Sequence, residues 1–273
     1  MKLMRKIFIF IYDFYNLLIQ RCNKNLFVFF YNLRASFGIT KGKISYKKNL
    51  FYLNNDYKKV YFTQKKLGIM FYSQGLKKRQ EKIKGRYFLN EIVFDDNDIV
   101  IDCGANYGDM FLYFEILEKK VDYHAFEPSP EEFSLLNNNT YGKIKTYNLA
   151  LGDKNGELDF YIKSKNADSS LIKPMDYDEI ITVNVMQLTD LFQDVKNIKL
   201  LKVEAEGAEI EVIKGSIGIL NNIEYITGDF GFERGIDQSE TYTEVKNILE
   251  KNNFELLKVS DQLTALFKNK NFN

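Results

Sequence analysis

Short apolar segments that end in an acidic residue recur along the chain, and helix-like segments separate them. The first two are Ile99-Val-Ile-Asp102 and Tyr123-His-Ala-Phe-Glu127, and residues 198–204 and 223–229 come later. Strands that alternate with helices at this spacing predict an α/β fold with a mostly parallel, doubly wound sheet. This alternation leaves few other architectures open to the chain.

Two further patterns predict antiparallel strands. A third parallel strand is expected at residues 145–150. After it, residues 156–162 and 180–185 alternate as half-exposed strands do, which indicates an antiparallel insertion. Residues 254–259 and 263–267 form a closing hairpin, so we expect the sheet to have an antiparallel edge.

The first third of the chain carries a charge opposite to that of the rest. Residues 1–90 contain 20 Lys and Arg against 3 Asp and Glu, whereas residues 91–273 contain 18 against 34. A basic segment suits an anionic neighbour such as a membrane face, a sugar nucleotide, an acidic subunit or nucleic acid, although a solvated basic surface has the same composition. We therefore divide the chain into a basic, aromatic-rich extension, residues 1–75, and an α/β domain, residues 76–273.

We expect the extension to be mainly helical, with Ile44-Ser-Tyr46 and Leu50-Phe-Tyr-Leu53 as short strands or an irregular linker. Its apolar run Ile7-Phe-Ile-Phe-Ile-Tyr12 is shorter than the ~20 residues that span a bilayer, and no small-residue cleavage site follows it. Apolar and basic residues then continue to Phe30 at amphipathic spacing. Such helices pack on the protein, form a dimer or lie on a membrane surface. We favour packing on the protein or docking on an acidic subunit over insertion into a bilayer.

The rarest side chains exclude several kinds of chemistry. The chain has two cysteines, Cys22 and Cys103, and one histidine, His124. These counts argue against a disulfide framework, a structural zinc site and Ser-His-Asp catalysis. They also favour a reducing compartment, so we expect a cytoplasmic protein, with the inner membrane face as a place where it could dock.

Glycines and polar residues follow each predicted strand. In an open α/β sheet, ligands bind beyond the carboxyl ends of the strands, near the switch in strand order. The residues at these ends are Asp102, Gly104, Asn106 and Gly108 after the first strand, Glu127 after the second, Asn148 and Ala150 at the third, Glu204 and Glu206 after the fourth, and Asp229 after the fifth. We expect them to meet at one edge of the sheet.

The first loop discriminates between nucleotide ligands. Gly104-Ala-Asn-Tyr-Gly108 lacks the G-x-G-x-x-G spacing that seats a pyrophosphate, and Asp102 before it repels phosphate and attracts an ammonium group. Glu127 suits the two hydroxyls of a ribose. A ligand with a ribose, an amino-acid ammonium and no phosphate is S-adenosylmethionine. The competing interpretation is that Asp102 and Glu127 only cap turns and helices.

Four blocks of the sequence resemble, in order, the signature blocks of the FkbM family of methyltransferases. They are Val100-Ile-Asp-Cys-Gly-Ala-Asn-Tyr-Gly108, Ala125-Phe-Glu-Pro-Ser-Pro130, Asn148-Leu-Ala-Leu-Gly-Asp153 and Lys202-Val-Glu-Ala-Glu-Gly-Ala-Glu209. Asp168-Ser-Ser-Leu171 is similar to the family's serine motif, and Asp229-Phe-Gly-Phe-Glu-Arg-Gly235 to a block found in part of the family. The resemblance covers residues 85–260 and not the start of the chain.

The resemblance implies a Rossmann-like class I methyltransferase fold and O-methylation of hydroxyls, often on sugars or polyketide-type products. It places Asp102, Gly104, Asn106 and Gly108 by the methionine part of S-adenosylmethionine, Glu127 by the ribose, and Asn148 to Ala150 by the adenine. The commoner form of the fourth block has aspartate where this chain has Glu204 and valine where it has Ala205. The acceptor side of the site is therefore left open.

Methyl transfer to a hydroxyl requires an aligned acceptor oxygen and a group that takes its proton. We expect His124 to be a structural residue inside a strand, so carboxylates are the candidates for the base. Glu206 is our first choice, and Glu204 and Asp229 are the alternatives. Glu206 could instead stabilise the start of the next helix. A divalent metal between these carboxylates is a further alternative, although we expect none.

We expect an S-adenosylmethionine-dependent O-methyltransferase that acts on a hydroxyl of a sugar, in a sugar nucleotide or a surface glycan. One alternative is a non-catalytic glycan- or membrane-associated binding protein that keeps the fold. Another is a methyltransferase that acts on RNA or another natural product. Only the basic extension suggests RNA, and the Asn-Pro-Pro-Tyr-type loop used on base amino groups is absent from the sequence.

Overall fold

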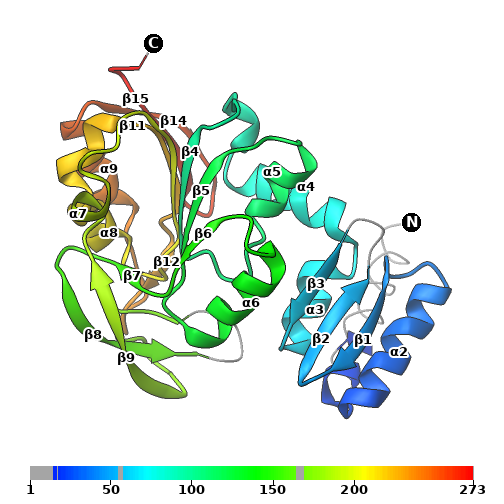
Figure 1. Ribbon diagram of the computed structural model, residues 1–273. Coiled ribbons are helices and arrows are strands. Elements are labelled where there is room, and N and C mark those ends of the chain that lie inside the picture. Colours follow the sequence, from blue (N-terminus) through cyan, green and yellow to red (C-terminus); the bar gives the residue numbers. More distant parts are fainter. Residues whose placement is uncertain (1–14, 17, 55–57, 164–168, 273) are drawn as a thin grey trace. The chain divides into compact units, whose positions relative to one another are not determined.

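Figure 1 shows the computed structural model, which describes residues 15–16, 18–54, 58–163 and 169–272. The chain divides into two units, residues 1–79 and 80–273. The helix α4 (Leu76–Arg86) begins in the first unit and ends in the second. Asp168 of the serine motif lies outside the described residues, as does the apolar run of residues 7–12.

The N-terminal unit contains a sheet as well as helices. Its elements are α2 (Lys24–Ser36), β1 (Lys43–Lys47), β2 (Leu50–Asn54), β3 (Lys59–Phe62) and α3 (Lys65–Tyr72). The strands form an antiparallel sheet in the order β1-β2-β3. The strand alternative for residues 44–46 and 50–53 is confirmed by β1 and β2, whereas β3 was not expected. Alternating residues such as Phe51 and Leu53 bury one face of this sheet.

Aromatic side chains make the core of this unit. Phe27 of α2 meets Phe51 at a centroid distance of 5.2 Å, and Phe51 stacks on Phe62 at 5.4 Å. Phe62 in turn lies 5.9 Å from Tyr72 of α3. Gly68 allows this close approach, because a Cβ there would lie 2.1 Å from the Phe62 ring.

A seven-stranded sheet forms the centre of the C-terminal unit. Its strands are β4 (Ile99–Cys103), β5 (Asp122–Phe126), β6 (Lys145–Tyr147), β10 (Ile198–Val203), β11 (Ile223–Asp229), β14 (Phe254–Val259) and β15 (Thr264–Asn269), in the order β14-β15-β11-β10-β4-β5-β6. The five strands from β11 to β6 in this order are parallel to one another. β15 pairs antiparallel with β11, and β14 pairs antiparallel with β15. The predicted doubly wound sheet with an antiparallel edge is confirmed.

Helices cover both faces of this sheet (Figure 1). α4, α5 (Phe111–Ile116) and α6 (Pro130–Thr140) pack on one face, and α7 (Leu188–Phe192), α8 (Glu209–Gly215) and α9 (Tyr242–Lys251) pack on the other. A short 3-10 turn, η1 (Leu89–Glu91), lies between α4 and β4, and a second, η2 (Ile217–Asn222), lies between α8 and β11. Alternation along β4 divides the two cores, since Val100 faces one and Ile101 the other.

The predicted third strand is interrupted after three residues. β6 ends at Tyr147, and β7 (Ala150–Leu151) joins a second sheet with β8 (Gly156–Ile162) and β9 (Glu179–Met186), in the order β7-β9-β8. The expected antiparallel insertion is the β8–β9 pair. The break falls at Asn148, whose amide donates to the carbonyls of Glu127 and Pro128 at 2.9 and 3.0 Å. A further hairpin, β12 (Phe232–Arg234) and β13 (Ser239–Glu240), follows β11.

The end of α8 depends on a glycine. A Cβ on Gly215 would lie 1.9 Å from the carbonyl oxygen of Gly152. We expect Gly215→Ala to lower the free energy of unfolding by about 1–3 kcal/mol, because the backbone must move to accept the methyl group. Urea denaturation measures this loss.

Gly85→Ala is the matched control, because a Cβ at this position of α4 meets nothing within 4 Å. It should raise stability by about 0.4–1 kcal/mol through the smaller entropy of the unfolded chain. Equal stabilities for the two variants would contradict the close packing of α8 on the Gly152 turn.

Candidate active site

The candidate site lies where the strand order of the main sheet reverses. β4 and β10 are neighbours there, and their carboxyl ends bring Asp102, Gly104 and Glu204 together. Gly104 has a φ of +73°, and a Cβ on it would lie 1.9 Å from the carbonyl oxygen of Glu204. Only glycine lets the two strand ends approach in this way. This reversal is the ligand-binding position of open α/β sheets.

Lys202 is buried between these strand ends. Its ammonium lies 3.0 Å from Asp102 and 3.2 Å from Glu204, and it donates to the carbonyls of Cys103 and Gly104 at 3.1 and 2.7 Å. Burial alone would lower the pKa of Lys202, but the two carboxylates raise it above its ordinary value. The side chain is therefore a fixed cation inside the sheet. We call Lys202 with Asp102 and Glu204 the Lys202 cluster.

Tyr123 contacts the Lys202 cluster through Asp102. Its hydroxyl donates to Asp102 at 2.6 Å, and both side chains are buried. Asp102 is fully buried, and the ammonium of Lys202 lies against its other carboxylate oxygen. The structure thus places the Asp102 carboxylate behind the glycine turn.

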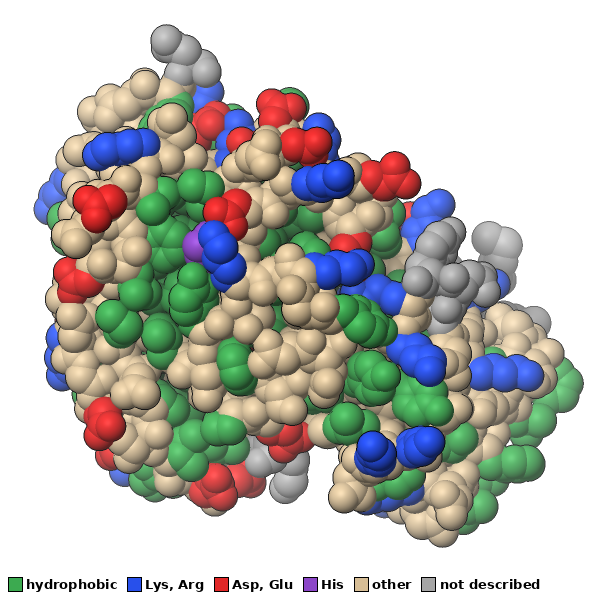
Figure 2. All heavy atoms as spheres, viewed as in Figure 1, with side chains coloured by type: hydrophobic (Ala, Val, Ile, Leu, Met, Phe, Trp, Pro, Cys, Tyr) green, Lys and Arg blue, Asp and Glu red, His purple; other side chains and the backbone are tan. Residues whose placement is uncertain are grey.

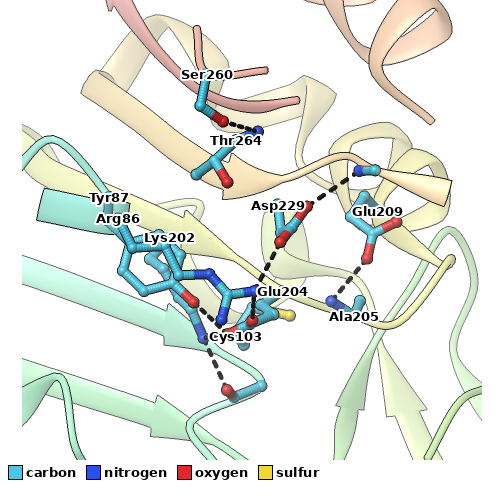
Figure 3. A network of polar contacts seen from close by, with 12 residues as sticks. Arg86, Tyr87, Cys103, Lys202, Glu204, Ala205, Glu209, Asp229, Ser260 and Thr264 are labelled. Atoms are coloured by element: carbon cyan, nitrogen blue, oxygen red, sulfur yellow. Dashed lines mark hydrogen bonds and ion pairs between the residues drawn. The ribbon is translucent and has the colours of Figure 1, made fainter. Parts of the chain in front are cut away.

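Arg86 and Tyr87, at the end of α4 and just beyond it, cover the cluster (Figure 3). The Arg86 guanidinium lies 2.7 Å from Glu204 and 2.6 Å from Asp229, so it joins the ends of β10 and β11. The Tyr87 hydroxyl donates to Glu204. Thr227 holds Tyr87 in place, because its hydroxyl donates to the Tyr87 carbonyl at 3.0 Å.

These contacts decide the proton affinity of Glu204. Burial would raise its pKa, but Lys202 and Arg86 outweigh burial and hold the pKa at about 2. Glu204 is therefore an anion at neutral pH and a weak proton acceptor. Asp229 is bound to the same guanidinium, and its other oxygen accepts the N–H of Gly231 at 3.1 Å. Both residues serve the architecture of the strand ends.

Glu127 lies at the end of β5, next to the glycine turn. Its carboxylate accepts the backbone N–H of Asn106 at 2.8 Å and that of Ser129 at 2.9 Å. Burial, followed by the charge of Glu132, raises the pKa of Glu127 to about 8. Anything that donates hydrogen bonds to this buried carboxylate would therefore shift its proton equilibrium.

The other residues predicted to hold a cofactor fall into two groups. Gly104, Asn106 and Gly108 form the turn after β4, all with positive φ. Asn148 supports the segment that carries Glu127, and Ala150 is buried in β7. The structure therefore brings the glycine turn and Glu127 together through the Asn106 contact.

The loop after β10 is shaped by three neighbours. Glu206 has a φ of +50°, and its carbonyl accepts the hydroxyl of Ser170 in the inserted segment at 2.6 Å. Arg234 donates to the Gly207 carbonyl at 2.6 Å. Glu209, which is buried, accepts the N–H groups of Ala205 and Gly207 at 2.8 and 3.0 Å. Figure 3 shows the Glu209–Ala205 contact. These bonds present Glu206 at a fixed turn beside the strand ends.

Glu233 is a further carboxylate at this edge. It lies in β12, half-buried, and a Cβ on Gly207 would lie 2.9 Å from its carbonyl oxygen, so β12 packs against the Glu206 loop. Burial, followed by the charges of Asp229 and Glu209, raises the pKa of Glu233 to about 8. A carboxyl with a pKa in this range can accept a proton at neutral pH.

The sequence did not single out Lys202, Arg86 or Tyr87, and it placed Glu233 after the fifth strand without a role. Lys202 did leave a signal, because a lysine in the middle of the apolar strand Ile198-Lys-Leu-Leu-Lys-Val203 requires an anionic partner. Arg86 and Tyr87 left none, since α4 is rich in basic residues and the contact spans 143 positions of sequence. Within the described ranges, no group of three His, Cys, Asp or Glu side chains is arranged to hold a metal ion.

A reversed strand order, a glycine turn and a buried carboxylate at the next strand end define the nucleoside-binding class of doubly wound α/β proteins. The methyltransferase FkbM domain matches residues 102–256, so this chain belongs to the FkbM methyltransferase family. S-adenosylmethionine is the cofactor of this family.

Three relatives show how far the similarity extends. Methyltransferase 1 of Beauveria bassiana is 29% identical over 148 residues, which cover 45% of this chain and 59% of that protein. The 2-O-methyltransferase NoeI of Sinorhizobium fredii is 22% identical and covers 58% of this chain and 74% of its own length. The hexuronic acid methyltransferase AglP of Haloferax volcanii is 24% identical, with coverage of 65% and 70%. The chain thus spans less than two thirds of the first relative.

The Lys202 cluster predicts a large effect of one substitution. Lys202→Met leaves Asp102 and Glu204 without their buried cation, so we expect a loss of about 3–5 kcal/mol in the free energy of unfolding. Chemical denaturation measures the loss. Lys214→Met is the control, because its ion pair with Glu244 is exposed and should contribute only about 0.2–1 kcal/mol. Similar small losses in both variants would show that the buried cation does not hold the strand ends.

Proposed function

We propose that this protein transfers a methyl group from S-adenosylmethionine to a hydroxyl of a sugar, in a sugar nucleotide or a surface glycan. The buried Glu127 carboxylate beside a glycine turn is the observation that carries the cofactor half of the proposal. The sugar half is supported by NoeI and AglP, whose names describe a 2-O-methyltransferase and a hexuronic acid methyltransferase.

The residues present fit this cofactor. Glu127 is a buried carboxyl group at the end of β5, where a ribose with two hydroxyl donors would meet it. We assign the methionine part to the turn of Gly104, Asn106 and Gly108, and the adenine to Asn148 and Ala150. Asp102 enters the proposal as support for the turn, because its carboxylate is bound to Lys202 and Tyr123.

When bound, S-adenosylmethionine would supply the methyl group from its sulfonium. The acceptor oxygen would form the new C–O bond as the S–C bond breaks. The chain must then align this oxygen and receive its proton. Glu204 and Asp229 are poorly suited to take the proton, because Arg86 binds both. We therefore propose Glu206 and Glu233 as the two carboxylates from which the base comes.

Transfer to sugars is tested with isotopically labelled S-adenosylmethionine and a panel of sugar nucleotides and glycans. Label in a product, released by treatment that cleaves methyl ethers, supports the proposal. Cofactor binding without transfer to any hydroxylated acceptor would favour the alternative of a binding protein.

Glu127 predicts how cofactor affinity depends on pH. Its raised pKa means that the carboxyl is partly protonated at neutral pH, whereas ribose hydroxyls bind the ionised form. Binding therefore releases a proton, and affinity should rise by up to about tenfold per pH unit towards pH 8 and then level off. Isothermal calorimetry across this range measures it.

Glu127→Gln is the comparison that isolates this group. The N–H groups of Asn106 and Ser129 bond to different oxygens of the carboxylate, so the amide keeps one of these two bonds and loses the charge. We expect the affinity above pH 8 to fall by about 1.5–3 kcal/mol and the difference from wild type to shrink at lower pH. The ionisation of the ligand itself contributes equally to both proteins. The same pH dependence in both would remove Glu127 from the ribose site.

The base is tested with Glu206→Gln and Glu233→Gln. Removal of the base should lower the single-turnover rate of methyl transfer by about 10²–10⁴-fold, with little change in cofactor affinity. If Glu233 is the base, the wild-type rate of methyl transfer should rise towards pH 8, and Glu233→Gln should abolish this rise. If Glu206 only supports the start of α8, its loss should instead appear as up to about 1 kcal/mol of stability. Near-wild-type rates in both variants would return the role to Glu204 or Asp229.

A further inference from the structure

The helix α2 has two apolar faces. Its inner face is covered, since Phe27 and Tyr31 are fully buried. Its outer side carries four exposed side chains, Leu26 (46%), Phe29 (59%), Leu33 (41%) and, at the end of the helix, Phe37 (75%). Their spacing of three to four residues puts all four on one side of the helix. We call them the α2 stripe.

An outer helix surface of this composition is unusual for a protein that meets only water. A surface helix normally turns charged and polar residues to the solvent, and a helix that is apolar all round is covered by something. The inner side of α2 is tied to β1 by Asn32, whose side chain exchanges two hydrogen bonds with the backbone of Ile44. The helix cannot therefore rotate to hide the stripe without losing these bonds.

The charges around the α2 stripe are all of one sign. Exposed basic residues stand at both ends of the helix, with Arg21 before it, Lys24 as its first residue, and Lys41 and Lys43 after it. Residues 14–55 contain no Asp or Glu. In Figure 2, the coloured residues of the N-terminal unit, at the lower right, show hydrophobic and basic side chains and no acidic ones. Aromatic and aliphatic side chains framed by Lys and Arg are typical of helices that lie in the surface of an anionic membrane.

We propose that the α2 stripe docks on an anionic phospholipid surface. The phenylalanines enter the boundary between headgroups and acyl chains, and the flanking basic residues bind lipid phosphates. This inference does not depend on the proposed function. Among the residues that the structure describes, no helix is long and apolar enough to cross a membrane.

Charge and apolarity together favour a lipid surface over the other occupants. An acidic protein surface would match the basic residues but would leave the α2 stripe in contact with water. A second copy of the unit would cover the stripe but would bring together two units with 17 Lys and Arg against 2 Asp and Glu each. The sequence favoured packing on the protein, and the structure shows such packing for the inner face of α2 only.

The test is flotation of the full chain with vesicles of phosphatidylglycerol and, separately, of phosphatidylcholine. We expect binding to phosphatidylglycerol at physiological salt, weaker binding at high salt, and little binding to phosphatidylcholine. The double variant Phe29→Ser with Phe37→Ser should reduce partitioning by about tenfold or more. Val93→Ser, a 77% exposed apolar position of the C-terminal unit, is the matched control and should bind as wild type does.

Charge is tested separately with Lys41→Gln and Lys43→Gln, which should weaken binding to phosphatidylglycerol and reduce its salt dependence. Thermal unfolding checks that every variant is folded. Three results would overturn the proposal: no flotation of the wild-type chain with phosphatidylglycerol, equal flotation of the phenylalanine variant, or a wild-type dimer in light scattering that the same variant abolishes. The last result would assign the α2 stripe to a second copy.

Discussion

A buried lysine between two parallel strands organises the functional edge of this protein. Lys202 in β10 bridges Asp102 at the end of β4 and Glu204 just beyond its own strand, and it also holds the carbonyls of Cys103 and Gly104. An ammonium inside the sheet would be costly alone, but two carboxylates keep it charged. These contacts hold the ends of β4 and β10 together where the strand order reverses, and they fix the position of the glycine turn.

This cluster divides the carboxylates of the site by proton affinity. Arg86 forms ion pairs with Glu204 and Asp229, and the pKa of Glu204 is held at about 2. At Glu127 and Glu233, burial and the charges of neighbouring carboxylates outweigh the nearby cations, and the pKa of each is raised to about 8. Carboxyl groups with a lowered pKa and carboxyl groups with a raised pKa thus lie along one edge of the sheet. One set stabilises the architecture, and the other can exchange protons near neutral pH, which suits ligand binding and proton removal.

Much of the fold was predictable because strand periodicity is local. The alternation of apolar strands and helices predicted the parallel sheet, and the hairpin at the end predicted its antiparallel edge. The break between β6 and β7 was not predictable, because the Asn148 bonds to the turn after β5 are tertiary contacts. In the extension, aromatic residues at amphipathic spacing favoured helices, whereas contacts such as Phe51 with Phe62 stabilise a small sheet.

The sequence by itself determined the fold class, the family and the position of the glycine turn after β4, because periodicity and the spacing of short motifs are properties of neighbouring residues. Tertiary structure alone decided what each carboxylate can do. Asp102 and Glu127 both follow short apolar strands, yet one is bound to a buried lysine and the other accepts only backbone N–H groups. The pKa of Glu204 likewise depends on burial and on cations such as Arg86, which lies far away in the sequence, and no local pattern records those distances.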